Sequence, residues 1–496
     1  MSLNRYFKLL KEFNHNKRLS LKSKKLLILS TDSNDFLINC SIAHVLVKLG
    51  HKVTLFIQNS GQSLNKKFYG LSSHKNFSSL IKVIIKNEIY VEYGEEVVGK
   101  ISNISIKLRK IIYRQTQEDV QRILKNPVYE KNKKNKKLFE QIERKNFNFA
   151  IKFKSFVKNN EFDNYIIDSG SWAEYGVAFS ILQELGKTIT CYGYRNDKNC
   201  IMISKNSPFN NLNIDEAWKE LKNNPISKSN FTIERISKKK FYKKDVFLNF
   251  HREDPLNKEI IYKRLFLKRN NYTILILTNL AYDTTVLTKK TNYLFKSHFD
   301  WLKRTIDFLI QKKNCNIIIR PHPAEKLTNC YMTCEKYINN YFEKLGESFT
   351  ILPSQTSINT YGLIDIADLG LVYSSDVGWE MVLKNKPVIS GGMGAAWGKN
   401  IQYDPKSLKD YFNKINIFIK NKKVAVPNSK KINAFKFMNF YMQEVPKTFP
   451  FPLFEYWNKH TFNEAGRIFQ SSTIPKKYKK TFEDLSNPLL SRKGVI

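Results

Sequence analysis

The chain has 496 residues, and its 83 Lys and Arg against 44 Asp and Glu give a net charge of +39 with His counted neutral. At roughly 100–200 residues per domain this length predicts two or three domains, and a hydrophobic content of 42% excludes a disordered or low-complexity protein. No apolar run approaches the ~18 residues that span a bilayer, and the basic start lacks the apolar core of a signal peptide, so a cytoplasmic protein is expected.

The charge first suggests a nucleic-acid partner. However, only 15 of the 83 basic residues are Arg, and Asn, Ile, Phe and Tyr are also abundant, as an AT-rich genome would favour. A lysine-rich background and an anionic partner therefore both remain open as explanations of the charge.

Residues 1–25 hold eight basic residues and one acidic residue beside several apolar ones, which keeps peripheral attachment to the inner face of the cytoplasmic membrane as an option. Packing of this segment on its own domain is the favoured alternative.

The first half of the chain begins with an α/β pattern. Residues 26–30 form a short apolar strand, residues 36–49 have helical spacing, and residues 52–57 form a second strand. This is the opening unit of a doubly wound parallel sheet. Residues 85–160 are predicted as long, lysine-rich amphipathic helices, and a further strand–loop–helix–strand unit begins at Tyr165.

The second half repeats the alternation after a Lys-, Ser- and Asn-rich linker at 220–245. Strands are predicted at YTILILTNL, NIII, FTILP, LGLVY and PVIS, and a long amphipathic helix is predicted from about Tyr293 to Gln311. We therefore predict an N-terminal Rossmann-like domain at 1–240, a C-terminal Rossmann-like domain at 241–435, and a tail at 436–496 that packs back across their junction; the resemblance described below implies that the first binds the acceptor and the second the nucleotide sugar. The fold class is α/β, with two doubly wound domains facing a cleft.

The loop RPHPAE directly follows the strand NIII. At the carboxyl end of a parallel strand this loop faces the ligand crevice, and its two prolines stiffen it. Arg320 offers a bidentate fork for phosphate, and His322 can donate to a phosphate oxygen or protonate a leaving group. We predict donor binding by Arg320 and Glu325 and a catalytic role for His322, against the alternative of a rigid turn with an exposed histidine.

Two further loops follow strands of the same half. Ser374 and Ser375 precede a helix whose N-terminus would favour a phosphate, and Glu380 lies one turn in, where it can accept from sugar hydroxyls. An ordinary serine cap is the alternative. In GGMGAAWGK, Gly392 would let the backbone approach a ligand, and Lys399 could neutralise a phosphate. The chain has no Walker A motif and no GxGxxG.

Candidate general bases lie in the first half. The loops TDSND at 31–35 and DSG at 168–170 both follow strands, so Asp35 or Asp168 could deprotonate an acceptor hydroxyl. Caps and turns are the more common use of such aspartates.

The six cysteines are scattered, and the C-x3-C of Cys330 and Cys334 has no second pair, so we expect free thiols and no metal site.

Taken together, RPHPAE, SS..GWE, KPVISGG, TNLAYD and DSGSWAEYG resemble bacterial capsule polysaccharide biosynthesis proteins of the GT-B glycosyltransferase type, over most of residues 25–420. The resemblance implies that His322 serves the donor phosphate or the leaving group, that Ser374 and Ser375 bind phosphate, and that Glu380 is the family's helix glutamate. The motif DSG loosely resembles the acidic-acidic-Gly motif that supplies the base in sialyltransferases, but Ile167 stands at its first acidic position.

The expected activity is metal-independent transfer of a sugar from a nucleotide-sugar donor to a surface or capsular glycan, free or lipid-linked, with no resident cofactor. A polyol-phosphate transferase or a sugar-nucleotide epimerase of the same fold is the alternative among enzymes. A non-catalytic scaffold or nucleic-acid-binding protein is the alternative from another class, which the absence of a recognisable RNA-binding signature disfavours.

Overall fold

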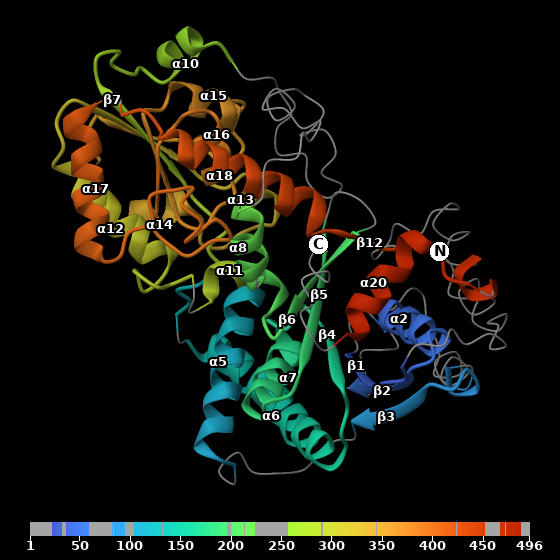
Figure 1. Ribbon diagram of the computed structural model, residues 1–496. Helices are drawn as coiled ribbons and strands as arrows, with labels where there is room; N and C mark the ends of the chain where they lie inside the picture. Colours follow the sequence, from blue (N-terminus) through green and yellow to red (C-terminus); the bar gives the residue numbers. More distant parts are fainter. Residues whose placement is uncertain are drawn as a thin grey trace. The chain divides into compact units, whose positions relative to one another are not determined.

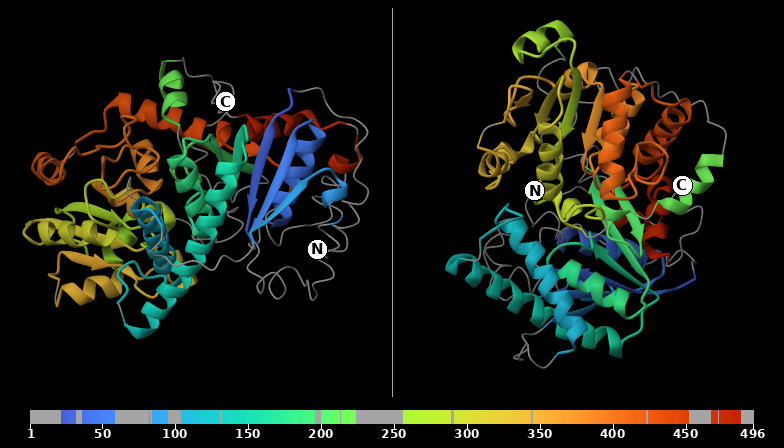
Figure 2. Two further views of the ribbon diagram at one scale, coloured as in Figure 1. Left: turned by 90° about the horizontal axis from the view of Figure 1, so that it is seen from below. Right: turned by 90° about the vertical axis from the view of Figure 1, so that its left-hand side faces the viewer.

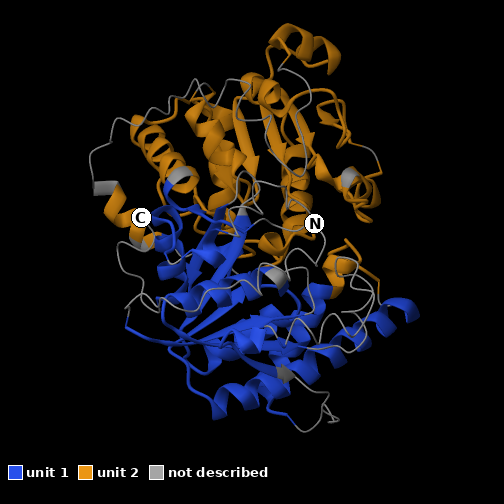
Figure 3. Ribbon diagram, turned by 90° about the vertical axis from the view of Figure 1, so that its right-hand side faces the viewer, with its two compact units in different colours: residues 1–119, 132–214, 444–496 blue, residues 120–131, 215–443 orange. Residues whose placement is uncertain are grey.

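A computed structural model describes most of the chain, in two compact units. The described residues are 22–31, 36–58, 82, 84–94, 104–130, 132–195, 200–212, 214–223, 256–288, 291–343, 345–422, 424–451, 467–471 and 473–487. Unit 1 comprises residues 1–119, 132–214 and 444–496, and unit 2 comprises residues 120–131 and 215–443 (Figure 3). Within the described ranges no helix combines the length and the apolar character needed to cross a membrane.

Unit 1 contains a seven-stranded sheet in the order β12-β6-β5-β4-β1-β2-β3 (Figure 1). The strands are β1 (Lys25–Ser30), β2 (Lys52–Gln58), β3 (Tyr90–Gly94), β4 (Asn164–Asp168), β5 (Ile189–Arg195), β6 (Cys200–Lys205) and β12 (Lys447–Thr448). The five strands from β5 to β3 in this order run parallel, whereas β6 and β12 join antiparallel at one edge.

Helices cover both faces of this sheet. They are α2 (Phe36–Lys48), α5 (Ile106–Ile123), α6 (Lys133–Asn159), α7 (Ala173–Glu184), a 3-10 turn (Phe209–Asn211) and α20 (Lys476–Ser486). Leu26 and Ile28 of β1 belong to the core with α2 and α20, whereas Leu27 and Leu29 belong to the core with α5, α6 and α7. Burial on both faces explains why β1 is a continuous apolar run instead of an alternating one.

Unit 2 contains a five-stranded parallel sheet in the order β11-β10-β7-β8-β9. The strands are β7 (Tyr272–Leu277), β8 (Cys315–Arg320), β9 (Phe349–Ile351), β10 (Leu369–Val372) and β11 (Val388–Ser390). The chain moves outward from β7 to β9 on one side and then returns to β10 on the other. The strand order therefore reverses between β7 and β10, which is where ligands bind in open α/β sheets.

Helices also lie on both faces of the second sheet (Figures 1 and 2). They are α8 (Asp215–Asn223), α10 (Lys258–Arg264), α11 (Thr284–Leu287), α12 (His298–Ile310), α13 (Ala324–Leu327), α14 (Cys334–Tyr341), α15 (Thr360–Ile366), α16 (Val377–Leu383), α17 (Leu408–Asn421), α18 (Asn428–Asn439) and a π-helical turn (Phe440–Glu444). One core joins α12, α14 and α17 to the sheet through residues such as Trp301 and Tyr411. Helices α15 and α16 contact β7 and β10, and α18 packs on α16.

The two mainly parallel, helix-covered sheets confirm the predicted α/β class with two Rossmann-like units. Two local predictions were wrong. The region 85–160 is not wholly helical, because Tyr90–Gly94 pairs with β2 as strand β3. The helix predicted from Tyr293 begins only at His298, because Ser297 caps it by accepting the N–H of Asp300 (3.1 Å).

The predicted domain bounds at 240 and 435 stay predictions. The linker placed at 220–245 lies largely outside the described residues. Residues 444–496 group with unit 1, and α18 groups with unit 2.

Candidate functional site

The candidate donor-binding residues lie at the carboxyl edge of the unit 2 sheet, and the strand register sets their level. Leu277 at the end of β7 pairs with Arg320 in β8 and with Val372 in β10. Two residues further along each strand stand Asn279, His322 and Ser374. All three therefore lie in the loops just past the paired residues of neighbouring strands, on both sides of the point where the strand order reverses. We call them the edge row.

His322 is held in a defined orientation at one end of the edge row. Its backbone N–H donates to Thr278 Oγ1 (3.2 Å), and its Nδ1 accepts the N–H of Ala324 (3.1 Å). An imidazole that accepts at Nδ1 carries its proton on Nε2 when it is neutral. The side chain is half-buried. The loop therefore fixes the tautomer in which Nε2–H is a hydrogen-bond donor, as phosphate binding requires. Protonation of a leaving group would instead need a ring protonated at both nitrogens.

Asn279 joins Ser374 to α12. Its Oδ1 accepts the N–H of Ser374 (3.4 Å), and its own N–H donates to Nε2 of His298 (3.1 Å). Burial and the neighbouring His322 lower the pKa of His298 to about 3, so His298 is neutral and its proton stands on Nδ1. Nδ1 of His298 has no partner among the described residues.

Thr278, Asn279 and His298 were not among the sequence candidates. The sequence does mark Thr278 and Asn279 as possible site residues, because they directly follow β7. This strand is the first of the unit 2 sheet along the chain and the central one in space. His298 carries no such signal, because it reaches the site from the first turn of a helix.

Ser374 and Ser375 follow β10 as predicted. The hydroxyl oxygen of Ser374 is buried and lacks a hydrogen-bond partner in the described part of the chain, whereas Ser375 Oγ accepts the N–H of Val377 (3.4 Å). Glu380 accepts the hydroxyl of Tyr361 (2.6 Å), and burial raises the pKa of Glu380 to about 7. Ser374 is thus the hydroxyl best placed to bind a ligand, whereas Ser375 Oγ closes a turn just before α16, whose N-cap is Asp376.

Arg320 and Glu325 are buried beneath the His322 loop. Nη1 of Arg320 donates to the carbonyl oxygens of Pro321 (3.0 Å), Pro353 (3.3 Å) and Ser354 (3.0 Å). Glu325 is 1% exposed and accepts the N–H of Cys334, the first residue of α14 (3.1 Å). These contacts favour positioning of the loop by both residues; direct donor binding by either stays a prediction.

Replacement of Glu325 by Gln should stabilise the protein at pH 8. Burial raises the pKa of Glu325 to about 7, so the folded protein holds this proton more tightly than the unfolded chain does, and its stabilising effect is lost as the pH rises from 4.5 through 7. Glutamine still offers an oxygen to Cys334 N–H but carries no charge. We expect Glu325→Gln to gain about 1–3 kcal/mol at pH 8 and much less at pH 5. Urea unfolding at both pH values tests this, and an equal change at both contradicts it.

The glycine-rich loop after β11 packs tightly against its neighbours. A Cβ on Gly392 would lie 2.8 Å from the carbonyl oxygen of Thr291, so this position needs glycine for close backbone approach. Lys399 is 5% exposed, and its Nζ lies 2.8 Å from Asp215 Oδ1 at the start of α8. Lys399 therefore ties the loop to α8, and its predicted contact with a donor phosphate stays a prediction.

The candidate bases belong to unit 1. Asp168 ends β4 next to β1, where the strand order of the first sheet reverses, and it is 3% exposed. Ser169 directly after it and Ala173 at the start of α7 have φ values of 46° and 43°. Left-handed backbone at residues other than glycine is strained, and such strain gathers at functional loops. Asp35 lies outside the described residues.

Comparisons with known proteins leave the chain without a family assignment. No protein-family model matches it. Protein Ycf2 of Physcomitrium patens is 25% identical over 323 residues, which are 63% of this chain and 13% of that protein. The chain thus spans about an eighth of the length of this curated relative.

Several solved structures share parts of the architecture at low similarity. The β-Kdo 2,4-transferase of Thermosulfurimonas dismutans KpsC is 14% identical over 55% of this chain and 78% of that chain, with a TM-score of 0.33. The β-Kdo 2,7-transferase of the same protein is 12% identical over 62% and 84%, with a TM-score of 0.32. UDP-GlcNAc 2-epimerase of Neisseria meningitidis is 9% identical over 84% and 100%, with a TM-score of 0.25. TM-scores this low do not establish a shared fold. The fold class therefore rests on the strand order described above.

Proposed function

We propose that this protein is a glycosyltransferase that binds a nucleotide-sugar donor at the carboxyl edge of the unit 2 sheet. The observation that carries the proposal is the edge row, in which Asn279, His322 and Ser374 follow the paired ends of three neighbouring strands across the reversal of strand order. The motif resemblance to capsule polysaccharide biosynthesis proteins supports the same activity.

The chemistry assigned to the edge row is neutralisation of the donor phosphate. In the transfer, the bond between the anomeric carbon and the phosphate oxygen breaks while a bond from the acceptor hydroxyl oxygen to that carbon forms. His322 donates a hydrogen bond from Nε2 to the departing phosphate and keeps its proton, and the Ser374 hydroxyl donates a hydrogen bond to a second phosphate oxygen. The proton of the acceptor passes to a base, for which Asp168 stays the sequence-predicted candidate.

The acceptor in this proposal is a surface or capsular glycan, free or lipid-linked. The transfer needs no divalent ion and no resident cofactor, because hydrogen-bond donors stabilise the leaving phosphate. The lysine-rich composition suits a position near the anionic inner face of the cytoplasmic membrane. These finer assignments rest on the sequence resemblance and on the charge.

A panel of nucleotide sugars tests the proposal. UDP-, GDP-, CDP- and CMP-sugars are screened by thermal shift against the wild type and His322→Ala, and any stabilising donor is then incubated with glycan acceptors. We expect one nucleotide class to raise the Tm of the wild type and to do so less in the variant. A panel without any stabilising nucleotide contradicts donor binding, and an epimerised nucleotide sugar as product supports the epimerase alternative.

A further inference from the structure

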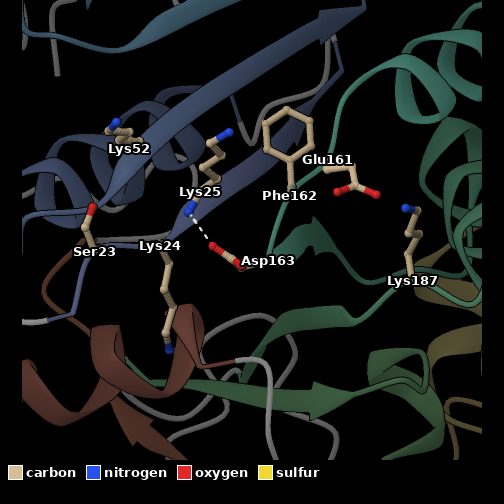
Figure 4. Close-up of a pocket in the computed structure, with 8 residues that line it drawn as sticks. All are labelled: Ser23, Lys24, Lys25, Lys52, Glu161, Phe162, Asp163 and Lys187. Carbon is tan, nitrogen blue, oxygen red and sulfur yellow. Dashed lines mark hydrogen bonds between the residues drawn. The ribbon is translucent and has the colours of Figure 1, made fainter.

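A polar cavity lies at the amino edge of the unit 1 sheet, opposite the carboxyl edge that carries Asp168. Its volume is about 520 Å³ (Figure 4), which lies within the range of ligand pockets. Its lining comes from the residues before β1, β4 and β5 and from the start of β2: Ser23, Lys24, Lys25, Lys52, Glu161, Phe162, Asp163 and Lys187. Asp168 ends β4, whereas Asp163 precedes it, so this cavity is separate from the candidate base.

The strand register arranges the charged residues of the cavity in a row. Lys25 and Lys52 are direct partners in the β1–β2 ladder. The N–H of Asp163 donates to the carbonyl of Lys25 (2.8 Å), and Asp163 Oδ2 accepts the N–H of Lys25 (2.7 Å). Lys187 stands two residues before Ile189, the partner of Tyr165. The order across the sheet edge is therefore Lys52, Lys25, Asp163, Lys187, with Lys25 and Asp163 in the middle of Figure 4.

The cavity has a net positive charge, because its lysines outnumber its carboxylates. Four lysines and two acidic residues line the cavity. Lys24 donates its ammonium to the carbonyl of Ser486 (3.3 Å). Among the described residues, Lys25, Lys52 and Lys187 have no carboxylate oxygen within 4.0 Å. Like charges on partner positions of a ladder repel each other, so a bound anion would relieve this repulsion.

The remaining lining groups are those that recognise a sugar. The half-buried Phe162 ring packs against the core beside Phe156 and Tyr165, with 6.0 and 5.6 Å between centroids, and its remaining surface adds an apolar patch to the lining on which a pyranose could rest. The carboxylates of Glu161 and Asp163 can accept hydrogen bonds from sugar hydroxyls. We propose that the cavity at the amino edge of the unit 1 sheet binds an anionic saccharide, whose phosphate or carboxylate is held by Lys25, Lys52 and Lys187.

Calorimetric titration of the full-length protein tests this site. The probes are glucose 6-phosphate, glucuronate and neutral glucose, so that a phosphate and a carboxylate are compared on the same ring. We expect the anionic sugars to bind and glucose not to. In the triple variant Lys25→Gln, Lys52→Gln, Lys187→Gln, affinity should fall about tenfold or more, because each substitution removes a charge-assisted hydrogen bond.

A matched triple variant controls for total charge. Lys133→Gln, Lys134→Gln, Lys137→Gln removes three charges from the exposed first turns of α6 and should change the affinity less than about twofold. Circular dichroism and Tm confirm that both triples fold. Equal affinity in the wild type and the cavity triple overturns the proposal, as does an equal loss in both triples. Binding that disappears in His322→Ala would place the anion at the edge row of unit 2 and also overturn this proposal, while the proposed donor binding there would stand.

Discussion

His322→Ala should lower kcat/KM for sugar transfer by about 10²–10³-fold, the usual loss when a positioned hydrogen-bond donor to the developing negative charge is removed. The reason is the tautomer fixed in the structure: Nδ1 accepts the N–H of Ala324, so the proton available for the donor phosphate stands on Nε2. The measurement is the initial rate of transfer with the nucleotide sugar that stabilises the wild type. An unchanged kcat/KM in a folded variant would remove His322 from the chemistry.

Two further variants separate the roles of His322. Asparagine can accept the N–H of Ala324 but offers nothing at the position of Nε2, so His322→Asn should fold normally and be as inactive as the alanine variant. Glutamine can place an N–H near the position of Nε2 but cannot release a proton. His322→Gln should therefore keep donor affinity and still lose kcat if His322 protonates the leaving phosphate, and it should recover both if the histidine only binds the phosphate.

The sheets were predictable because they depend on local pattern. A strand buried on both faces is a continuous apolar run, as in β1 and β7, and such runs show in the sequence wherever they occur. Strand β3 was missed because only Tyr90–Gly94 forms it, with polar and aromatic residues mixed at the edge of the sheet. Edge strands bury one face at most, and their pattern is correspondingly weak.

The candidate site was predictable only at its loops. The position of His322 and Ser374 after parallel strands follows from the sequence, since the carboxyl ends of such strands meet at one edge. Partners from distant segments do not follow from it. Lys399 meets Asp215 from 184 positions away, and Arg320 meets the carbonyl of Ser354 from 34 positions away. Sequence reasoning assigned these two cations to phosphate because their other partners were not visible.

Replacement of Lys205 is expected to have a large effect on the free energy of unfolding. Lys205 is 5% exposed at the end of β6, and its Nζ donates at 2.6 Å to Thr190 Oγ1 and to the carbonyl oxygens of Asp484 and Asn487 at the end of α20. Burial lowers the pKa of Lys205 to about 7, although the nearby Asp484 acts in the opposite direction. The folded protein therefore binds this proton less tightly than the unfolded chain does, and its stability rises as the pH increases from about 7 towards 10.

Lys205→Ala should destabilise unit 1 by about 3–5 kcal/mol at pH 9, because the variant leaves a cavity and removes the amine, which in its neutral form donates to two of the three acceptors around it. The deficit should shrink by about 1 kcal/mol per pH unit towards pH 7, where the wild type begins to bury a charge. Burial raises the pKa of Asp484 to about 6, so the titration of that carboxyl changes the stability only below the interval from pH 7 to pH 9. Urea unfolding at pH 7, 8 and 9 measures the trend, with the exposed Lys133→Ala as the control of near-zero effect. A deficit that is constant with pH would mean that Lys205 is charged throughout and that α20 is held by an ammonium ion instead of a neutral amine.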